Sequence, residues 1–166
     1  QLGPEEVVEL IERQLSRMSE DTVGYRELEY SLSLALFRLR KFDRAESILK
    51  RFDSDFDEVS SGRSAYLSLR ADLAYRNGDN ESAIVWLEQL LAAEETTGRA
   101  DRLGELYARL GVVLYAAGKV DRALKVLSDS AQRYAQSGGT QKANHLKRTV
   151  ALLKNQPVWD KTQTGR

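Results

Sequence analysis

This sequence contains no cysteine, only one histidine and only two prolines. The absence of cysteine excludes disulfides, thiol nucleophiles and thiolate metal sites. The single histidine, His145, has no second histidine with which to form a metal site or a catalytic dyad. The apolar runs are much shorter than the roughly 20 residues that a membrane-spanning helix needs, so we expect no membrane insertion.

Other familiar chemical motifs are also missing. Gly138 and Gly139 precede a helical pattern, but no strand comes before them and no lysine and hydroxyl pair follows, as a phosphate loop would require. The acidic stretch 53–58 lacks the central glycine and the terminal glutamate of a calcium loop. We therefore expect a protein that is not an enzyme and that holds neither a cofactor nor a metal.

The start of the chain and its lack of cysteine do not determine its full-length context or its cellular compartment. The sequence begins at Gln1, which suits a fragment of a longer protein or a mature protein without its targeting segment. No signal-like stretch opens it. The cysteine content is compatible with the cytoplasm, which we expect, and also with the periplasm.

Charge is balanced overall but divided unevenly along the chain. The 25 Lys and Arg match the 25 Asp and Glu, yet residues 1–98 hold 20 acidic and 12 basic side chains, while residues 99–166 hold 5 and 13. The two parts therefore carry about −8 and +8 charges. Such asymmetry points to charged partners or to self-association rather than to a fold.

Proline and glycine are placed as in a helical protein. Pro4 and Pro157 lie near the two ends, and Ala, Leu, Glu, Arg and Lys dominate the segments between the glycines, which favours helices throughout. Apolar residues recur three and four positions apart. We predict an all-α protein without strands, with eight helices at about 4–18, 22–40, 43–52, 60–77, 81–95, 100–117, 121–136 and 140–155.

Three similar phrases recur along the chain: RLRKFDRAESIL at 38–49, YRNGDNESAIVW at 75–86 and AAGKVDRALKVL at 116–127. Their alignment places Ala45, Ala83 and Ala123 at intervals of 38 and 40 residues, each in the first turn of the second helix of a pair. Small residues are needed there because the paired helices approach closely. A period of this length indicates a solenoid of stacked helical hairpins.

The repeat resembles the tetratricopeptide repeat family. The residues that carry the resemblance are Tyr107, Leu110, Gly111, Leu114, Gly118, Val120, Ala123 and Leu127 in the third unit, Leu67, Ala71, Ala74, Gly78, Ala83 and Leu87 in the second, and Leu32, Leu36, Phe42, Ala45 and Leu49 in the first. Four positions depart from the family pattern, namely Ser33, Arg40, Arg70 and Asn80. Leu146, Val150 and Ala151 indicate a further half unit. The period exceeds the family's usual 34 residues.

The resemblance implies one right-handed α-solenoid of antiparallel helix pairs over residues 1–166. The expected parts are an N-terminal helix (4–18), repeats at 22–52, 60–95 and 100–136, a capping helix (140–155) and a tail (156–166). It also implies a scaffold, adaptor or sensing module that binds a peptide or helix of a protein partner in its concave groove. The groove residues expected from the family register are Tyr30, Leu34, Phe37, Arg38, Leu69, Asp72, Tyr75, Arg76, Arg109, Val112 and Ala116.

One family-specific mode of binding does not fit this sequence. Chaperone-binding members hold a C-terminal carboxylate with lysines and asparagines at set groove positions. Those positions hold Tyr30, Leu34, Leu69 and Glu105 in this chain, and only Arg109 has a suitable charge. A chaperone-tail clamp is therefore not expected.

Two other functions remain as alternatives. The first is homotypic assembly, in which the acidic first half of one copy meets the basic second half of another. The second is RNA binding by a basic patch on the terminal helix, formed by Lys142, His145, Lys147 and Arg148. The acidic first half opposes binding to a long nucleic acid duplex.

Overall fold

The computed structural model describes residues 3–51, 63–95 and 100–155, and these residues form eight α-helices and no strand. The helices are α1 (Pro4–Leu15), α2 (Tyr25–Arg38), α3 (Phe42–Lys50), α4 (Arg63–Arg76), α5 (Asn80–Glu95), α6 (Ala100–Ala116), α7 (Val120–Gln136) and α8 (Thr140–Asn155). The predicted all-α fold is thus confirmed. Within the described ranges, no helix has the length and apolar character needed to cross a membrane.

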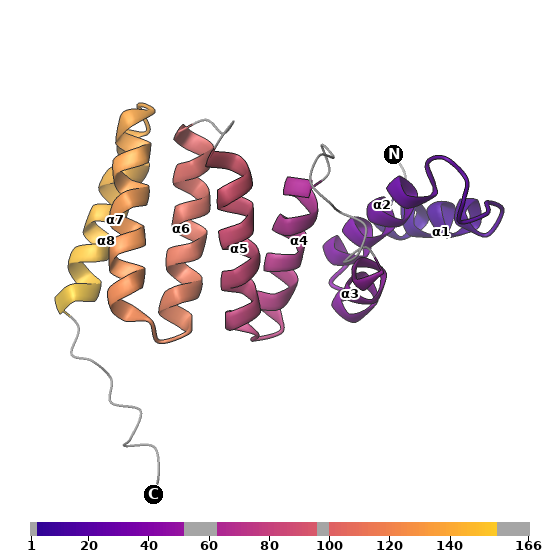
Figure 1. The fold of residues 1–166 in the computed structure, drawn as a ribbon, viewed down its shortest axis with the longest axis horizontal. Coiled ribbons are helices and arrows are strands. Elements are labelled where there is room, and N and C mark those ends of the chain that lie inside the picture. The colour runs from indigo at the N-terminus through magenta and orange to yellow at the C-terminus, as the bar shows by residue number, and fades with distance from the viewer. Residues whose placement is uncertain (1–2, 52–62, 96–99, 156–166) are drawn as a thin grey trace, which may run out of the picture. The chain divides into compact units, whose positions relative to one another are not determined.

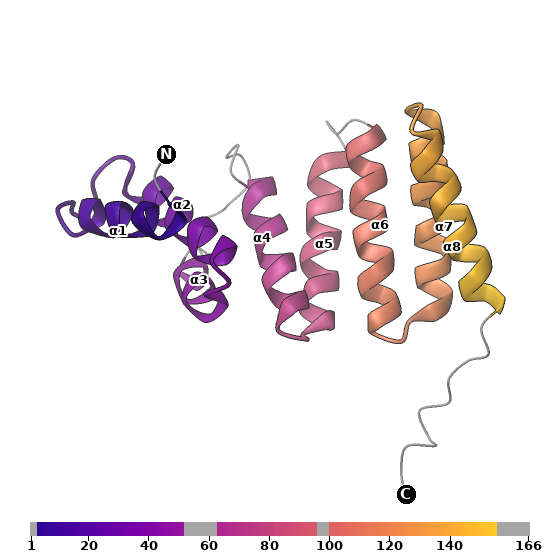
Figure 2. The same ribbon diagram turned by 180° about the vertical axis from the view of Figure 1, so that it is seen from behind.

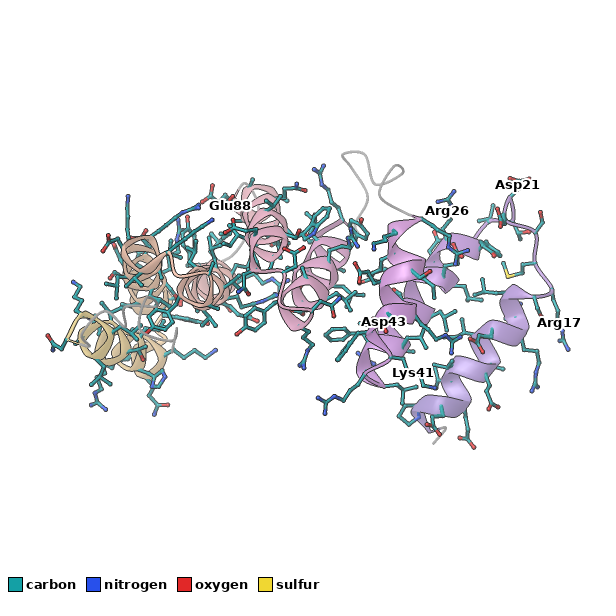
Figure 3. The ribbon with its side chains drawn as sticks, turned by 90° about the horizontal axis from the view of Figure 1, so that it is seen from below. Arg17, Asp21, Arg26, Lys41, Asp43 and Glu88 are labelled. Atoms are coloured by element: carbon teal, nitrogen blue, oxygen red, sulfur yellow. The ribbon has the colours of Figure 1, made fainter. Side chains whose placement is uncertain are left out.

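The observed helix ends lie close to the predicted ones, with the largest shifts around the first connection. α1 ends at Leu15 instead of residue 18, and α2 begins at Tyr25 because Gly24 before it adopts a positive φ of 89°. Arg17 and Asp21 in this connection are exposed and point outward (Figure 3). The predicted acidic loop at 53–62, Phe52 at the end of the third helix, and the tail at 156–166 all lie outside the described residues.

The chain divides into two compact units, each with its own core. Unit 1 comprises residues 1–90 and unit 2 comprises residues 91–166. In unit 2, α6, α7 and α8 lie side by side and run alternately up and down (Figures 1 and 2). Leu106 and Leu114 on α6 are fully buried there, as are Leu36 and Leu49 in unit 1.

The repeated phrases form the same backbone structure at each helix-to-helix joint. Arg40, Gly78 and Gly118 follow α2, α4 and α6 and have positive φ values of 61°, 79° and 77°. In each joint, the amide of the residue after the positive-φ residue donates to the carbonyl five residues earlier, as from Lys119 to Leu114 at 2.9 Å. These bonds satisfy carbonyls in the last turn of the helix. Figure 3 labels Lys41 at the first of these joints and Asp43 in the first turn of α3.

The second helix of each pair then starts in a matching way. Ala45, Ala83 and Ala123 are fully buried, and each donates its amide to the residue four positions earlier. At α5 the carboxylate of Asp79 caps the helix by accepting the amide of Ser82 at 3.0 Å. The hydrogen bond from the Ser82 side chain, followed by that from its amide, holds the pKa of Asp79 below its usual value. The burial of the three alanines agrees with the close helix approach predicted for these positions.

A fourth joint of the same type connects α7 to α8, where the sequence suggested only a break. Gly138 has a φ of 81°, and the amide of Gly139 donates to Tyr134 at 2.7 Å. Ala143 then occupies the alanine position and is 2% exposed. The motif therefore closes a connection between successive pairs as well as the hairpin within a pair, because both require the same reversal of the chain.

Arg40 is the one residue other than glycine with a positive φ in the described part of the chain. The left-handed conformation costs an L-residue about 1–2 kcal/mol. Glycine avoids this cost but loses more conformational entropy on folding, so Arg40→Gly should stabilise the protein by about 0.5–1 kcal/mol. Gly78→Ala, at the equivalent joint, should destabilise it by about 1 kcal/mol. Urea unfolding followed by circular dichroism measures both, and opposite signs are required.

The small-residue positions of the first helices also follow the repeat. Ser33, Ala71 and Gly111 each precede by 16 residues a buried leucine of the second helix, Leu49, Leu87 and Leu127. Ser33 is fully buried and satisfies its hydroxyl by donating to the carbonyl of Tyr30 at 2.7 Å, so a polar residue is tolerated there. The departure at Arg70 is explained by Trp86, because the guanidinium stacks 4.8 Å from the centre of that ring.

Candidate functional site

The first helices of the repeats leave all but one of the predicted groove residues exposed or half-buried. These residues are described for each unit separately. In unit 1, Arg38 on α2 and Tyr75 and Arg76 on α4 are exposed, while Tyr30, Leu34, Phe37 and Asp72 are half-buried. Burial raises the pKa of Tyr30, so its phenol stays neutral at physiological pH. Leu69 is only 4% exposed and packs in the core, so its side chain is not available to a partner.

Two predicted groove residues of unit 1 meet in one aromatic cluster. The guanidinium of Arg76 lies 5.7 Å from the ring centre of Phe37 and 5.3 Å from that of Phe42. The two rings are 5.4 Å apart and tilted by 56°. This cation and ring contact links the ends of α2 and α4 to the start of α3, so the cluster is partly structural. Sequence reasoning assigned Phe42 to the repeat signature and not to this cluster.

In unit 2, the predicted residues of α6 lie on an open helix face. Val112 is 51% exposed, Ala116 is also exposed, and Arg109 is half-buried and engaged in an interaction. Tyr115, which the sequence prediction omitted, is 40% exposed. The face of α6 therefore presents an aliphatic and an aromatic side chain three residues apart.

The omitted Tyr115 belongs to a repeated pattern. Phe37, Tyr75 and Tyr115 each lie three residues before the positive-φ residue that ends α2, α4 and α6. An aromatic ring thus occupies the same position in all three first helices, and the tyrosines are 42% and 40% exposed. The signal was present in the sequence, since Tyr115 lies 40 residues after Tyr75, the same interval as between Ala83 and Ala123.

The predicted basic patch is exposed along α8. Lys142, His145, Lys147 and Arg148 are all exposed, and Lys154 adds a further charge near the helix end. No acidic residue occurs in α8. The side chains do not form one face, because Lys147 is two residues from His145 and so lies more than half a turn around the helix from it.

A buried tyrosine forms the floor of a hollow between α6 and α8. Tyr134 on α7 is 6% exposed, and its ring packs so closely on Gly104 of α6 that a Cβ there would lie 3.2 Å from ring atoms. Beside it, Ser130 donates to the carbonyl of Gly104 at 2.6 Å. Lys142 of α8 lies over the same ring, with its Nζ 5.0 Å from the centre.

Two cavities open around this ring. One, of about 370 Å³, is lined by Ala108, Tyr134, Gln141, Lys142, His145 and Leu146. The other, of about 420 Å³, shares Tyr134, Gln141 and Lys142 and adds Asp101 and the joint at 137–140. Both are depressions that are widely open to solvent rather than enclosed cavities. Sequence reasoning did not find this hollow, because Tyr134 lies in the second helix of its pair.

A polar cluster elsewhere in unit 2 has a structural role. Tyr107 donates its hydroxyl to Glu95 at 2.9 Å and accepts a bond from Arg133 at 3.3 Å, and that guanidinium stacks 4.5 Å from the Tyr107 ring. Burial, followed by the hydrogen bond to Glu95, raises the pKa of Tyr107. The cluster links the end of α5 to α6 and α7.

The described residues offer no arrangement suited to metal binding. Among them, no group of three or more His, Asp and Glu side chains converges in a way that could hold a metal ion. What the open faces offer is aromatic, aliphatic and basic contact surface. Aromatic and arginine side chains are enriched at protein interfaces relative to the rest of the surface.

Comparison with known proteins defines the class of fold. No protein-family model matches this sequence, and no curated protein sequence matches it. Solved structures do match, and they include the TPR-like repeats of a putative kinesin light chain. The chain therefore has a tetratricopeptide-type repeat fold, as the sequence resemblance implied.

Three of these structures can be described individually. BtubC (BKLC) from P. vanneervenii has a TM-score of 0.69 at 23% identity, over 82% of this chain and 58% of that chain. The TPR-like repeats of a putative kinesin light chain from Podosopora anserina score 0.65 at 18% identity, over 97% of this chain and 87% of that one. MamA scores 0.58 at 13% identity, over 91% and 88%. This chain spans less than two thirds of BtubC, and at these identities the likeness establishes the fold alone.

Proposed function

We propose that this chain is a non-catalytic protein-interaction module, a scaffold, adaptor or sensing domain, that binds a peptide or helix of a partner through its first-helix faces. The observation that carries the proposal is the exposed aromatic ring at one register position, Tyr75 on α4 and Tyr115 on α6. An aromatic ring that is about 40% exposed at the same register position of two first helices offers a partner the same kind of contact on each. Tyrosine is also among the residue types that contribute most to binding at interfaces.

The surroundings of the two tyrosines fit this use. Val112 is half-exposed one turn before Tyr115, and Arg76 follows Tyr75. Aromatic and arginine side chains with an aliphatic neighbour are typical of the anchors that a partner side chain packs against. The fold supports the proposal by presenting such side chains on successive first helices, although fold alone does not define a function.

The double variant Tyr75→Ser with Tyr115→Ser tests the proposal. Both rings are substantially exposed, so stability should change by no more than about 1 kcal/mol, and circular dichroism should be unchanged. Proteins captured by the native chain in quantitative affinity purification should be lost, and each one, once purified, should bind the variant at least about tenfold more weakly by calorimetry.

A matched control is available on α5. Val85 is 49% exposed, close to the 51% of Val112, but lies on a second helix. Val112→Asp should weaken the same partners, whereas Val85→Asp should leave their affinity unchanged. Partners that bind the tyrosine variant as tightly as the native chain would show that the first-helix faces are not the binding surface.

A further inference from the structure

The hollow in unit 2 has a composition that selects a particular kind of segment. Ala108 and Leu146 form apolar walls, the Tyr134 ring forms the floor, and Gln141, Lys142 and His145 supply polar and basic groups along one wall. Asp101 and Glu105 on α6 are the acidic side chains on the facing helix. The rim is predominantly basic, because α8 contains three Lys, one Arg and no acidic residue.

Three exposed apolar side chains, which we call the apolar lip, lie further along α6 and α8 from the residues that line the hollow. Val112 and Tyr115 lie four and seven residues after Ala108 on α6, and Leu152 lies seven residues after His145 on α8, so helical periodicity places them on the same sides. Val112, Tyr115 and Leu152 are 51%, 40% and 67% exposed. A segment that fits must combine negative charge with two apolar anchors, one for the hollow and one for the lip.

The chain itself contains such a segment. Residues 52–59 read FDSDFDEV, with two phenylalanines four residues apart and four acidic side chains between and after them. Eight residues in extended form span about 27 Å, close to the roughly 24 Å length of the 16-residue α8. The two phenylalanines would be about 13 Å apart, comparable with the rise of about 10 Å from Ala108 to Tyr115.

We propose that the hollow between α6 and α8 binds residues 52–59 of a second copy of this chain, so that copies associate head to tail. Phe52 and Phe56 enter the hollow and the apolar lip, and the carboxylates pair with Lys142, His145 and Arg148. The inference rests on the proposed function, because it identifies the occupant of a first-helix face. A contact between two different surfaces is heterologous and produces rings or open chains of copies.

Reversing charge on the two sides of α8 provides the test. Lys142→Glu with Arg148→Glu changes a residue that lines the hollow and the residue about one turn after His145 on α8. Lys147→Glu with Lys154→Glu makes the same net change on another side, since both lysines lie about half a turn around from His145. Sedimentation velocity of the full chain at low salt should show association for the native protein and the second variant. The first variant should associate at least about tenfold more weakly.

A reciprocal substitution makes the assignment specific. Asp53, Asp55, Asp57 and Glu58 all changed to Lys should also abolish association, and mixing that variant with Lys142→Glu and Arg148→Glu should restore it. A labelled peptide of residues 50–60 should bind a further variant in which Asp53, Asp55 and Asp57 are changed to Asn and Glu58 to Gln. Raising salt from about 0.05 to 0.5 M should weaken this binding because exposed charges are screened.

Each other outcome overturns the inference. A native chain that stays monomeric up to about 0.5 mM at low salt excludes association of copies, even if the peptide binds. Equal loss of association in the two charge-reversal pairs would show a general charge effect. If the native chain bound mixed-sequence RNA but not the peptide, and Lys142→Glu with Arg148→Glu abolished RNA binding, the rim would be assigned to RNA. A monomer whose partners still depend on Tyr75 and Tyr115 would overturn this inference and leave the proposed function standing.

Discussion

Gly111→Val is expected to lower the free energy of unfolding by about 3 kcal/mol, because it overfills the contact between α6 and α7. A Cβ at residue 111 would lie 2.6 Å from Cγ and Cδ2 of Leu127, well inside van der Waals contact. Leu127 is 3% exposed and surrounded by the core, so it cannot move aside without displacing its neighbours. Helix propensity does not produce this loss, since valine is no worse than glycine in a helix.

Urea unfolding of two companion variants isolates this effect. Ala116→Val adds bulk to an exposed position of the same helix and should change stability by less than about 0.5 kcal/mol. Leu127→Ala makes room at residue 111, so the double variant should be more stable than the sum of the two single effects by at least about 1 kcal/mol. Equal free energies of unfolding for Gly111→Val and Ala116→Val would contradict the close packing of α6 on α7 at residue 111.

Leu114→Ala should cost about 3 kcal/mol, because Leu114 is fully buried at the end of α6. Its removal leaves a cavity in unit 2, and its carbonyl accepts the amide of Lys119 in the joint to α7, so the backbone there is held in place. A site that cannot collapse retains the cavity and loses the full packing energy.

The control for this prediction changes the same atoms on the surface. Leu152 on α8 is 67% exposed, so Leu152→Ala should alter the unfolding free energy by less than about 0.5 kcal/mol. The difference between the two variants in the urea midpoint, with unchanged slope, measures the burial of Leu114 directly. Similar midpoints would contradict the core assignment of α6.

The candidate surface was only partly predictable from the sequence. Transfer of the family register selected Tyr75, Val112 and Ala116, which are exposed, but it also selected Leu69, which is buried. Register gives the face of a helix, whereas burial depends on what packs against that face. Tyr115 was omitted from the predicted groove, although the sequence contained a signal for it, since it lies 40 residues after Tyr75.

The hollow around Tyr134 was not predictable in the same way. Its lining comes from α6, α7 and α8, and its floor is a residue of a second helix that local pattern assigns to the core. A cavity forms where packed side chains fail to fill the space between helices, which depends on their combined shapes. No spacing of residues along one helix contains that information.

The sequence by itself determined the helices, their joints and the repeat, because these depend on local interactions. Positive φ after α4 and α6 follows from glycine, the cap of α5 from Asp79, and close helix approach from Ala83 and Ala123. Tertiary structure alone decided that Arg40 adopts the glycine conformation, that Arg70 is placed over Trp86, and that a hollow opens beside Lys142. The Arg70 stacking and the hollow depend on contacts between different helices, which the pattern of any one helix does not contain. The reversal of the chain between α2 and α3 requires a positive φ and outweighs the backbone preference of Arg40.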